Sequence, residues 1–172
     1  PMPDREIRAA LADDRLMRYQ PTPFGHPAAR EAVAAYHGGA VGWEQVILTA
    51  STSEAYALLF KLLADPDDRV LVPVPSYPLF DYLAGLEGVE TVSYPFAWVE
   101  GGWFLDFGAL EARIDGRTRA VVVVSPNNPT GAMLRQDEAD RLLSICRDRG
   151  LALIVDEVFA DHVFTATPSR LR

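Results

Sequence analysis

Four polar segments hold the residue types best suited to chemistry, and each follows an apolar run. The first, TASTSEA, places Ser51, Thr52 and Ser53 where a helix is expected to begin. The N–H groups at a helix start have no partner within the helix, and the helix dipole favours an anion there. The hydroxyls add further donors, so the segment suits a phosphate group. Simple capping of the helix by the same residues is an open alternative.

The other segments supply an amide, a carboxylate and an aromatic ring. Asn128 lies in SPNNPTG, which follows four valines, and Asp156 ends the apolar stretch LALIVD. A carboxylate at the end of an apolar strand is desolvated and needs a cation or a hydrogen-bond donor. Its alternative role is to cap a neighbouring helix or to pair with an arginine. Tyr77 lies in a fourth loop, VPSYPLF, after another apolar run.

Alternating sequence patterns predict the elements that position these residues. Strands are predicted at residues 46–49, 69–74, 89–95, 119–125 and 151–157, helices at 4–14, 27–37, 51–64, 77–86, 106–114 and 135–149, and a loop or hairpin at 96–103. Such alternation indicates an α/β fold, a mainly parallel sheet with helices on both faces. Ligands bind at the carboxyl ends of the strands in such sheets, where the polar segments lie.

Composition narrows the function classes. A net charge of −8 argues against nucleic-acid binding, and no apolar run is long enough for a membrane span. The single cysteine, Cys146, fits a reducing compartment, so we expect a cytoplasmic protein. His26, His37 and His162 lack metal-ligand spacing and are expected at the surface, whereas Cys146 is expected in the core. Neither GxGxxG nor GxxxxGK[ST] is present, which leaves a Rossmann-like nucleotide-binding domain without its fingerprint.

Five strings, in this order, resemble the class I/II aminotransferases of pyridoxal-phosphate (PLP) fold type I. They are YQPTPFGHPAAREAVAAY, ILTASTSEA, VLVPVPSYPLF, SPNNPTG and VDEVF. The resemblance covers nearly the whole chain. It implies PLP as the cofactor, and an amino acid and a 2-oxo acid as substrates.

The resemblance also implies roles for individual residues. Ser51, Thr52 and Ser53 match the segment that holds the PLP phosphate, and Tyr77 matches the aromatic residue that stacks on the pyridine ring. Asn128 matches the asparagine that binds the ring 3′-oxygen, and Asp156 matches the carboxylate that pairs with the ring nitrogen. Tyr19 matches a tyrosine that reaches the cofactor of a partner subunit, which implies a homodimer.

The chain departs from the family pattern at three places. The lysine that carries PLP as a Schiff base belongs to a segment downstream of Arg172, and Lys61, the only lysine, is expected to be a helix-surface charge. Phe159 stands where many relatives have a tyrosine that donates to the 3′-oxygen, and Ala50-Ser51 stand where many have Asn-Gly. Arg30 matches a family position, but pairing with a nearby acid is an alternative.

These departures shape the expected domain content. We expect residues 1–172 to form part of the large cofactor-binding domain, without the N-terminal arm, the Schiff-base lysine segment or the C-terminal small domain. No catalytic residue and no metal ligand are then expected in this chain, and it is expected to be inactive alone. Within the same cofactor class, a C–S lyase, a synthase, a decarboxylase or a non-catalytic PLP-fold regulatory module are the alternatives.

Overall fold

The computed structural model describes residues 3–162, which fall into two compact units divided between Thr49 and Ala50. The first unit contains α1 (Asp4–Leu11), η1 (Asp14–Met17), α2 (Pro27–Tyr36) and η2 (Trp43–Gln45). The second contains α3 (Thr52–Leu63), β1 (Arg69–Val74), α4 (Phe80–Leu86), β2 (Glu90–Val99), β3 (Gly102–Leu105), α5 (Phe107–Glu111), β4 (Thr118–Val124), α6 (Gln136–Arg149) and β5 (Ala152–Asp156).

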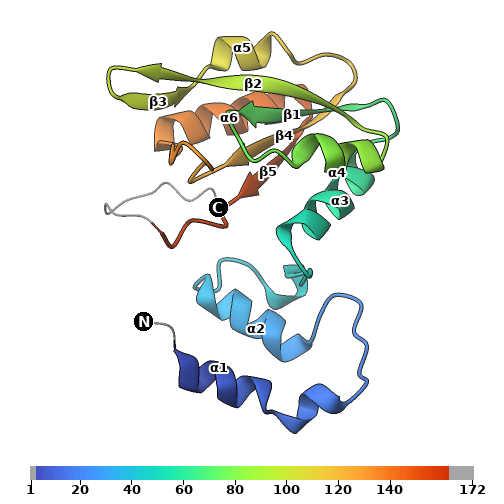
Figure 1. The fold of residues 1–172 in the computed structure, drawn as a ribbon. Helices are drawn as coiled ribbons and strands as arrows, with labels where there is room; N and C mark the ends of the chain where they lie inside the picture. Colours follow the sequence, from blue (N-terminus) through green and yellow to red (C-terminus); the bar gives the residue numbers. More distant parts are fainter. Residues whose placement is uncertain (1–2, 163–172) are drawn as a thin grey trace. The chain divides into compact units, whose positions relative to one another are not determined.

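The second unit is built on one sheet with the strand order β3-β2-β1-β4-β5 (Figure 1). The pairs β1–β2, β1–β4 and β4–β5 are parallel, whereas β3 pairs antiparallel with β2 through a hairpin. The predicted α/β fold with a mainly parallel sheet is therefore confirmed. All four parallel strands end at the same edge of the sheet, so the loops that follow them meet there.

Alternating side chains of β4 enter two separate hydrophobic cores. Val121 and Val123 pack with Leu142 and Cys146 of α6, whereas Val122 and Val124 pack with Phe60 of α3. Helices therefore cover both faces, α5 and α6 on one and α3 and α4 on the other, as predicted. β4 is an interior strand because it is buried on both faces and paired on both sides. Burial of Cys146 in this core raises the pKa of its thiol to about 11.

The predicted strand at residues 46–49 is wrong. These residues form no strand, although the backbone is extended at Val46 and the Leu48 N–H donates to the Phe24 carbonyl oxygen at 3.0 Å. A β-branched run becomes a strand only when a neighbouring strand completes its hydrogen bonds, and residues 3–162 supply none. The helix predicted at 106–114 is also shorter, ending at Glu111.

Arg30 is a buried cation in the first unit, with 8% of its surface exposed. Its guanidinium donates to the carbonyl oxygens of Val46 at 2.6 Å and Glu44 at 2.9 Å, and it stacks over the Trp43 ring at 4.9 Å. Arg30 therefore ties the segment at residues 44–46 to α2 through backbone carbonyls, and not through the acidic side chain that the sequence suggested as an alternative. Across residues 3–162, no helix is long and apolar enough to cross a membrane.

Candidate functional site

The register of β4 and β5 brings two of the predicted site residues together. Val124 and Asp156 are paired at the carboxyl ends of their strands, and the Ser125 N–H extends the ladder by donating to the Asp156 carbonyl oxygen at 2.9 Å. The turn that carries Asn128 begins directly after this point. The amide and the carboxylate therefore lie at one edge of the sheet because of strand pairing.

A cavity of about 220 Å³ lies at this edge, and we call it the main cavity. Its lining includes Thr52, Ser53, Tyr77, Asn128, Asp156 and Phe159. These residues come from four separate segments of the chain: the start of α3, the loop before α4, the turn after β4 and the end of β5. The structure thus brings five of the seven predicted cofactor contacts around one space, together with Phe159; their roles are still predictions.

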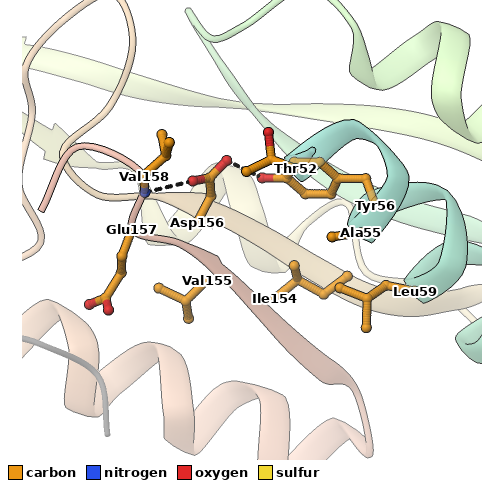
Figure 2. Close-up of a pocket in the computed structure, with 9 residues that line it drawn as sticks. All are labelled: Thr52, Ala55, Tyr56, Leu59, Ile154, Val155, Asp156, Glu157 and Val158. Carbon is orange, nitrogen blue, oxygen red and sulfur yellow. Dashed lines mark hydrogen bonds between the residues drawn. The ribbon is translucent and has the colours of Figure 1, made fainter. Parts of the chain in front are cut away.

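A second cavity of about 200 Å³, the side cavity, adjoins the same carboxylate (Figure 2). Thr52, Tyr56, Asp156 and Val158 line both cavities. The rest of the side cavity is mainly apolar, with Leu59 of α3 and Ile154 of β5 among its lining residues. The Tyr56–Asp156 contact therefore lies between the two spaces.

Asp156 is half-buried and accepts hydrogen bonds from two neutral donors. The Tyr56 hydroxyl donates to Oδ2 at 2.7 Å, and the Val158 N–H donates to Oδ1 at 2.9 Å. Burial and the nearby carboxylate raise the pKa of Tyr56 well above its ordinary value, so this phenol stays a donor at neutral pH. The expected hydrogen-bond partner of Asp156 is confirmed, and in residues 3–162 no arginine or lysine forms an ion pair with it.

The three predicted phosphate ligands at the start of α3 make different contacts. Ser51 is the N-cap, and its hydroxyl oxygen accepts the Glu54 N–H at 3.2 Å. Thr52 and Ser53 line the main cavity, whereas Ser51 is not in its lining. Capping therefore occupies the side chain of Ser51, while the first-turn N–H groups of Thr52 and Ser53 have no acceptor within the helix.

Asn128 lies in a turn that its neighbours hold in place. The Asn127 side-chain oxygen accepts the Thr130 hydroxyl at 2.8 Å, and the Asn127 N–H donates to the Ala132 carbonyl oxygen at 2.8 Å. Asn127 is almost fully buried, with 3% of its surface exposed, whereas Asn128 is half-buried and lines the cavity. The two adjacent asparagines thus divide into one that holds the turn and one that faces the cavity.

Three other predictions concern residues outside the main cavity. Tyr19 belongs to the first unit, where it is 94% exposed, and its role is still a prediction. Lys61 is exposed on α3 and lies 3.6 Å from Glu87, which agrees with a helix-surface charge. The three histidines are exposed, and the described part of the chain contains no His/Cys/Asp/Glu cluster suited to a metal ion.

Tyr56 is the site residue that the sequence interpretation missed. It lies one turn before Phe60 on the apolar face of α3, where an aromatic residue is normally read as core. Its ring is indeed core, packed at 5.1 Å from the Phe80 ring. The signal that could have identified it is its hydroxyl, because a buried tyrosine needs a hydrogen-bond partner.

Comparison with known proteins agrees with this arrangement. The family model "Aminotransferase class I and II" matches residues 3–171. The chain is 31% identical over 152 residues to nicotianamine aminotransferase 1 of Oryza sativa subsp. japonica, covering 86% of this chain and 31% of that protein. It is 30% identical to tyrosine aminotransferase of Mus musculus, covering 92% and 35%. Alanine aminotransferase from Pyrococcus furiosus has a TM-score of 0.82 and 30% identity, covering 91% of this chain and 40% of that one.

The chain matches only part of each relative. The chain spans about a third of the length of the curated relatives it matches. The family model nevertheless covers nearly all of its residues. The chain belongs to the class I and II aminotransferase family.

Proposed function

We propose that this chain forms the PLP-binding part of an aminotransferase that moves an amino group between an amino acid and a 2-oxo acid. The observation that carries the proposal is the main cavity, where hydroxyls, an amide, an aromatic ring and a carboxylate converge. Family membership supports the reaction, since the similar proteins from rice, mouse and Pyrococcus furiosus are named as aminotransferases.

The donor set of the main cavity fits the functional groups of PLP. Asp156 would pair with the ring nitrogen, and the Asn128 amide would donate to the ring oxygen. Tyr77, which lines the cavity and is 46% exposed, would supply an aromatic face for stacking. Thr52 and Ser53, at the positive end of the α3 dipole, would hold the phosphate.

Asp156 would contribute most to the chemistry. When bound, PLP supplies an electron sink, which deepens when its ring nitrogen is protonated. At roughly 4 Å and an effective dielectric constant near 20, a carboxylate attracts such a cation by about 4 kcal/mol before desolvation is subtracted. The half-buried Asp156 has no ion-paired cation within the described range, so its charge is available to that proton.

The remaining proposals concern the whole protein. Tyr19 would reach the cofactor site of a second copy in a homodimer, and the cell compartment would be the cytoplasm. Lys61 lines neither cavity and lies beside Glu87, so it would not bond covalently to the cofactor. We therefore expect residues 1–172 to bind PLP without forming a specific adduct.

Titration of the 172-residue chain with PLP, followed by borohydride reduction and mass spectrometry, tests the proposal. We expect saturable one-to-one binding, weakened by Asp156→Asn, with no stoichiometric adduct. The matched control is Lys61→Arg, which removes the only lysine, a residue outside the cavity, and should leave binding unchanged. Absence of saturable binding, or a stoichiometric adduct on Lys61 that accounts for all of it, contradicts the proposal.

A further inference from the structure

Tyr56 joins two parts of the chain that lie 100 positions apart in sequence. It belongs to α3, is 6% exposed, and donates its hydroxyl to Asp156 Oδ2 at 2.7 Å. Figure 2 shows the phenol pointing from α3 to the carboxylate at the end of β5. The first turn of the same helix carries Thr52 and Ser53, so one helix contacts the site at two points.

The Tyr56 ring is fixed by packing. It lies 5.8 Å from the Phe60 ring and 5.1 Å from the Phe80 ring, the latter edge-on at 85°. These contacts come from two helices on the same face of the sheet. Because the ring cannot swing without disturbing that core, its hydroxyl is aimed at the carboxylate before any ligand binds.

We propose that Tyr56 is a positioning residue that holds Asp156 toward the ring nitrogen of the bound cofactor and limits how tightly that nitrogen keeps its proton. The inference rests on the proposed function. Tyr56 occupies one oxygen of the carboxylate and the Val158 N–H the other, at 2.9 Å, which fixes the plane of the group. Each oxygen keeps a second lone pair for the cavity.

The direction of the expected pKa change depends on which protonation state of the ring nitrogen the Tyr56 hydroxyl stabilises more. When the ring nitrogen loses its proton, Asp156 keeps its full negative charge and the Tyr56 hydrogen bond is strongest. When the nitrogen is protonated, the ion pair already satisfies part of that charge. The hydroxyl therefore favours the deprotonated ring and lowers the pKa of the ring nitrogen.

Few other ionisable groups face Asp156. Tyr77 lines the main cavity from the loop before α4, and Glu157, the next residue in the chain, points the opposite way from Asp156 (Figure 2). The described residues that line the two cavities include no arginine, lysine or histidine. Burial and the Asp156 charge raise the pKa of Tyr56, so it remains a neutral donor over the range in which a pyridine nitrogen titrates.

The test uses the 172-residue chain with pyridoxine 5′-phosphate labelled with ¹⁵N in its ring. This probe has the ring nitrogen and phosphate but no aldehyde, so it cannot react with Lys61. The nitrogen chemical shift of the bound probe, followed against pH, gives the midpoint of its protonation. We expect Tyr56→Phe to raise this midpoint by about half a pH unit, because the hydrogen bond to Asp156 forms in both protonation states and only the difference in its strength shifts the midpoint. A residue that acted only by orienting the carboxylate would lower it.

Two control variants distinguish failure of the proposed function from failure of the inference about Tyr56. Tyr94→Phe deletes another buried tyrosine hydroxyl, one that donates to the Val122 carbonyl oxygen at 2.6 Å, and should leave the midpoint unchanged. Asp156→Asn should lower the midpoint by at least about one unit. If the unmodified chain does not bind the probe, the proposed function fails and the inference fails with it. If Asp156→Asn shifts the midpoint but Tyr56→Phe leaves it unchanged or lowers it, the inference alone is overturned.

A second substitution keeps the test valid if Tyr56→Phe does not fold. Tyr56→3-fluorotyrosine preserves the shape of the ring and makes the phenol a stronger donor. It should lower the midpoint, in the direction opposite to the phenylalanine variant. A shift in the same direction as the phenylalanine variant, or none, would overturn the role of the hydroxyl.

Discussion

Charged side chains differ in their partners between the two edges of the parallel sheet. They form ion pairs at the amino edge, whereas the carboxylate at the carboxyl edge has neutral partners. At the amino ends of the strands, Arg69 pairs with Glu90 at 2.9 Å and with Asp115, and Arg119 pairs with the buried Asp68 at 3.0 Å. Each of these charges finds its counter-charge within the chain. They join the start of β1 to the start of β2 and to the segment that leads into β4.

At the carboxyl edge, the carboxylate of Asp156 has no counter-charge among the described residues. Asp156 accepts hydrogen bonds only from neutral donors, the Tyr56 hydroxyl and the Val158 N–H, among the residues that the structure describes. It borders a cavity, whereas Asp68 is enclosed. We propose from this contrast that the paired charges at the amino edge stabilise the fold and that the carboxylate at the carboxyl edge receives a cationic ligand.

The largest expected effect comes from making the same substitution at both edges. Asp156→Asn should weaken pyridoxine 5′-phosphate binding by at least about tenfold, while the free energy of unfolding changes by less than about 1 kcal/mol. Asp68→Asn should do the reverse, because it removes the charge that a buried carboxylate uses to pair with the Arg119 guanidinium at 3.0 Å, whereas Asp156 has only neutral donors, which an amide oxygen can still bind. Its expected cost is about 2 kcal/mol of stability. Calorimetric titration and urea unfolding measure the two effects, and equal effects of both variants would remove the distinction.

The next effect is on the pH dependence of stability. The Arg69 guanidinium lowers the pKa of Glu90, and the Arg117 N–H together with Arg69 lowers that of Asp115. A lowered folded-state pKa gives stability that is present above the unfolded-state value and is lost as pH falls through the folded-state value. Arg69→Met should therefore lose less unfolding free energy than the unmodified chain between about pH 5 and about pH 3.

Urea unfolding at a series of pH values measures this slope. Arg149→Met is the matched control, since Arg149 lies in the last turn of α6 and forms no ion pair within residues 3–162. It should keep the slope of the unmodified chain. Parallel curves for Arg69→Met and the unmodified chain would show that the amino-edge pairs add nothing to acid stability.

A smaller effect is expected at Phe159, which lines the main cavity without a polar group. Phe159→Tyr adds a hydroxyl that can donate to the ring oxygen of the ligand. Affinity for pyridoxine 5′-phosphate should rise by about two- to fivefold, the value of one added hydrogen bond. The 3-deoxy analogue serves as the control probe and should bind both forms equally. Unchanged affinity for the parent probe would mean that residue 159 does not face the ring oxygen.

The smallest effect concerns Glu54 in the first turn of α3. Its carboxylate accepts the Ala50 N–H at 2.5 Å, next to the proposed phosphate position. Glu54→Gln should cost about 0.3–1 kcal/mol of stability, because an acid at a helix start interacts favourably with the dipole. It should also strengthen phosphate binding by less than about threefold, since one repelling charge is removed. Weaker binding would show that Glu54 supports the site.

The sequence predicted the sheet well where local pattern and tertiary role agree. The four valines of β4 form a β-branched run with no polar face, and such a run is typical of a strand buried on both sides. Polar residues after these runs indicate the loops that follow β1, β4 and β5, and the resemblance to the class I/II aminotransferases then singles out Tyr77, Asn128 and Asp156. Their convergence then follows from parallel pairing.

Prediction failed where a residue depends on a partner distant in sequence. Residues 46–49 have strand-forming side chains, but the described chain offers no strand to pair with them. Ser51 caps α3 by accepting the Glu54 N–H, an alternative that the sequence left open, and its contact with a phosphate is still a prediction. The sequence does not indicate a role for Tyr56, because that role depends on a contact with β5. The Tyr56 hydroxyl lies 2.7 Å from Asp156 Oδ2, 100 positions away in the chain.

The most direct test of the central claim compares two ligands that differ at one atom. The affinities of the unmodified chain and of Asp156→Asn are measured for pyridoxine 5′-phosphate and for its benzene analogue, in which carbon replaces the ring nitrogen. We predict that the unmodified chain prefers the pyridine ligand by at least about tenfold and that Asp156→Asn abolishes the preference. The same preference in both proteins would contradict the claim that this carboxylate receives a ring nitrogen.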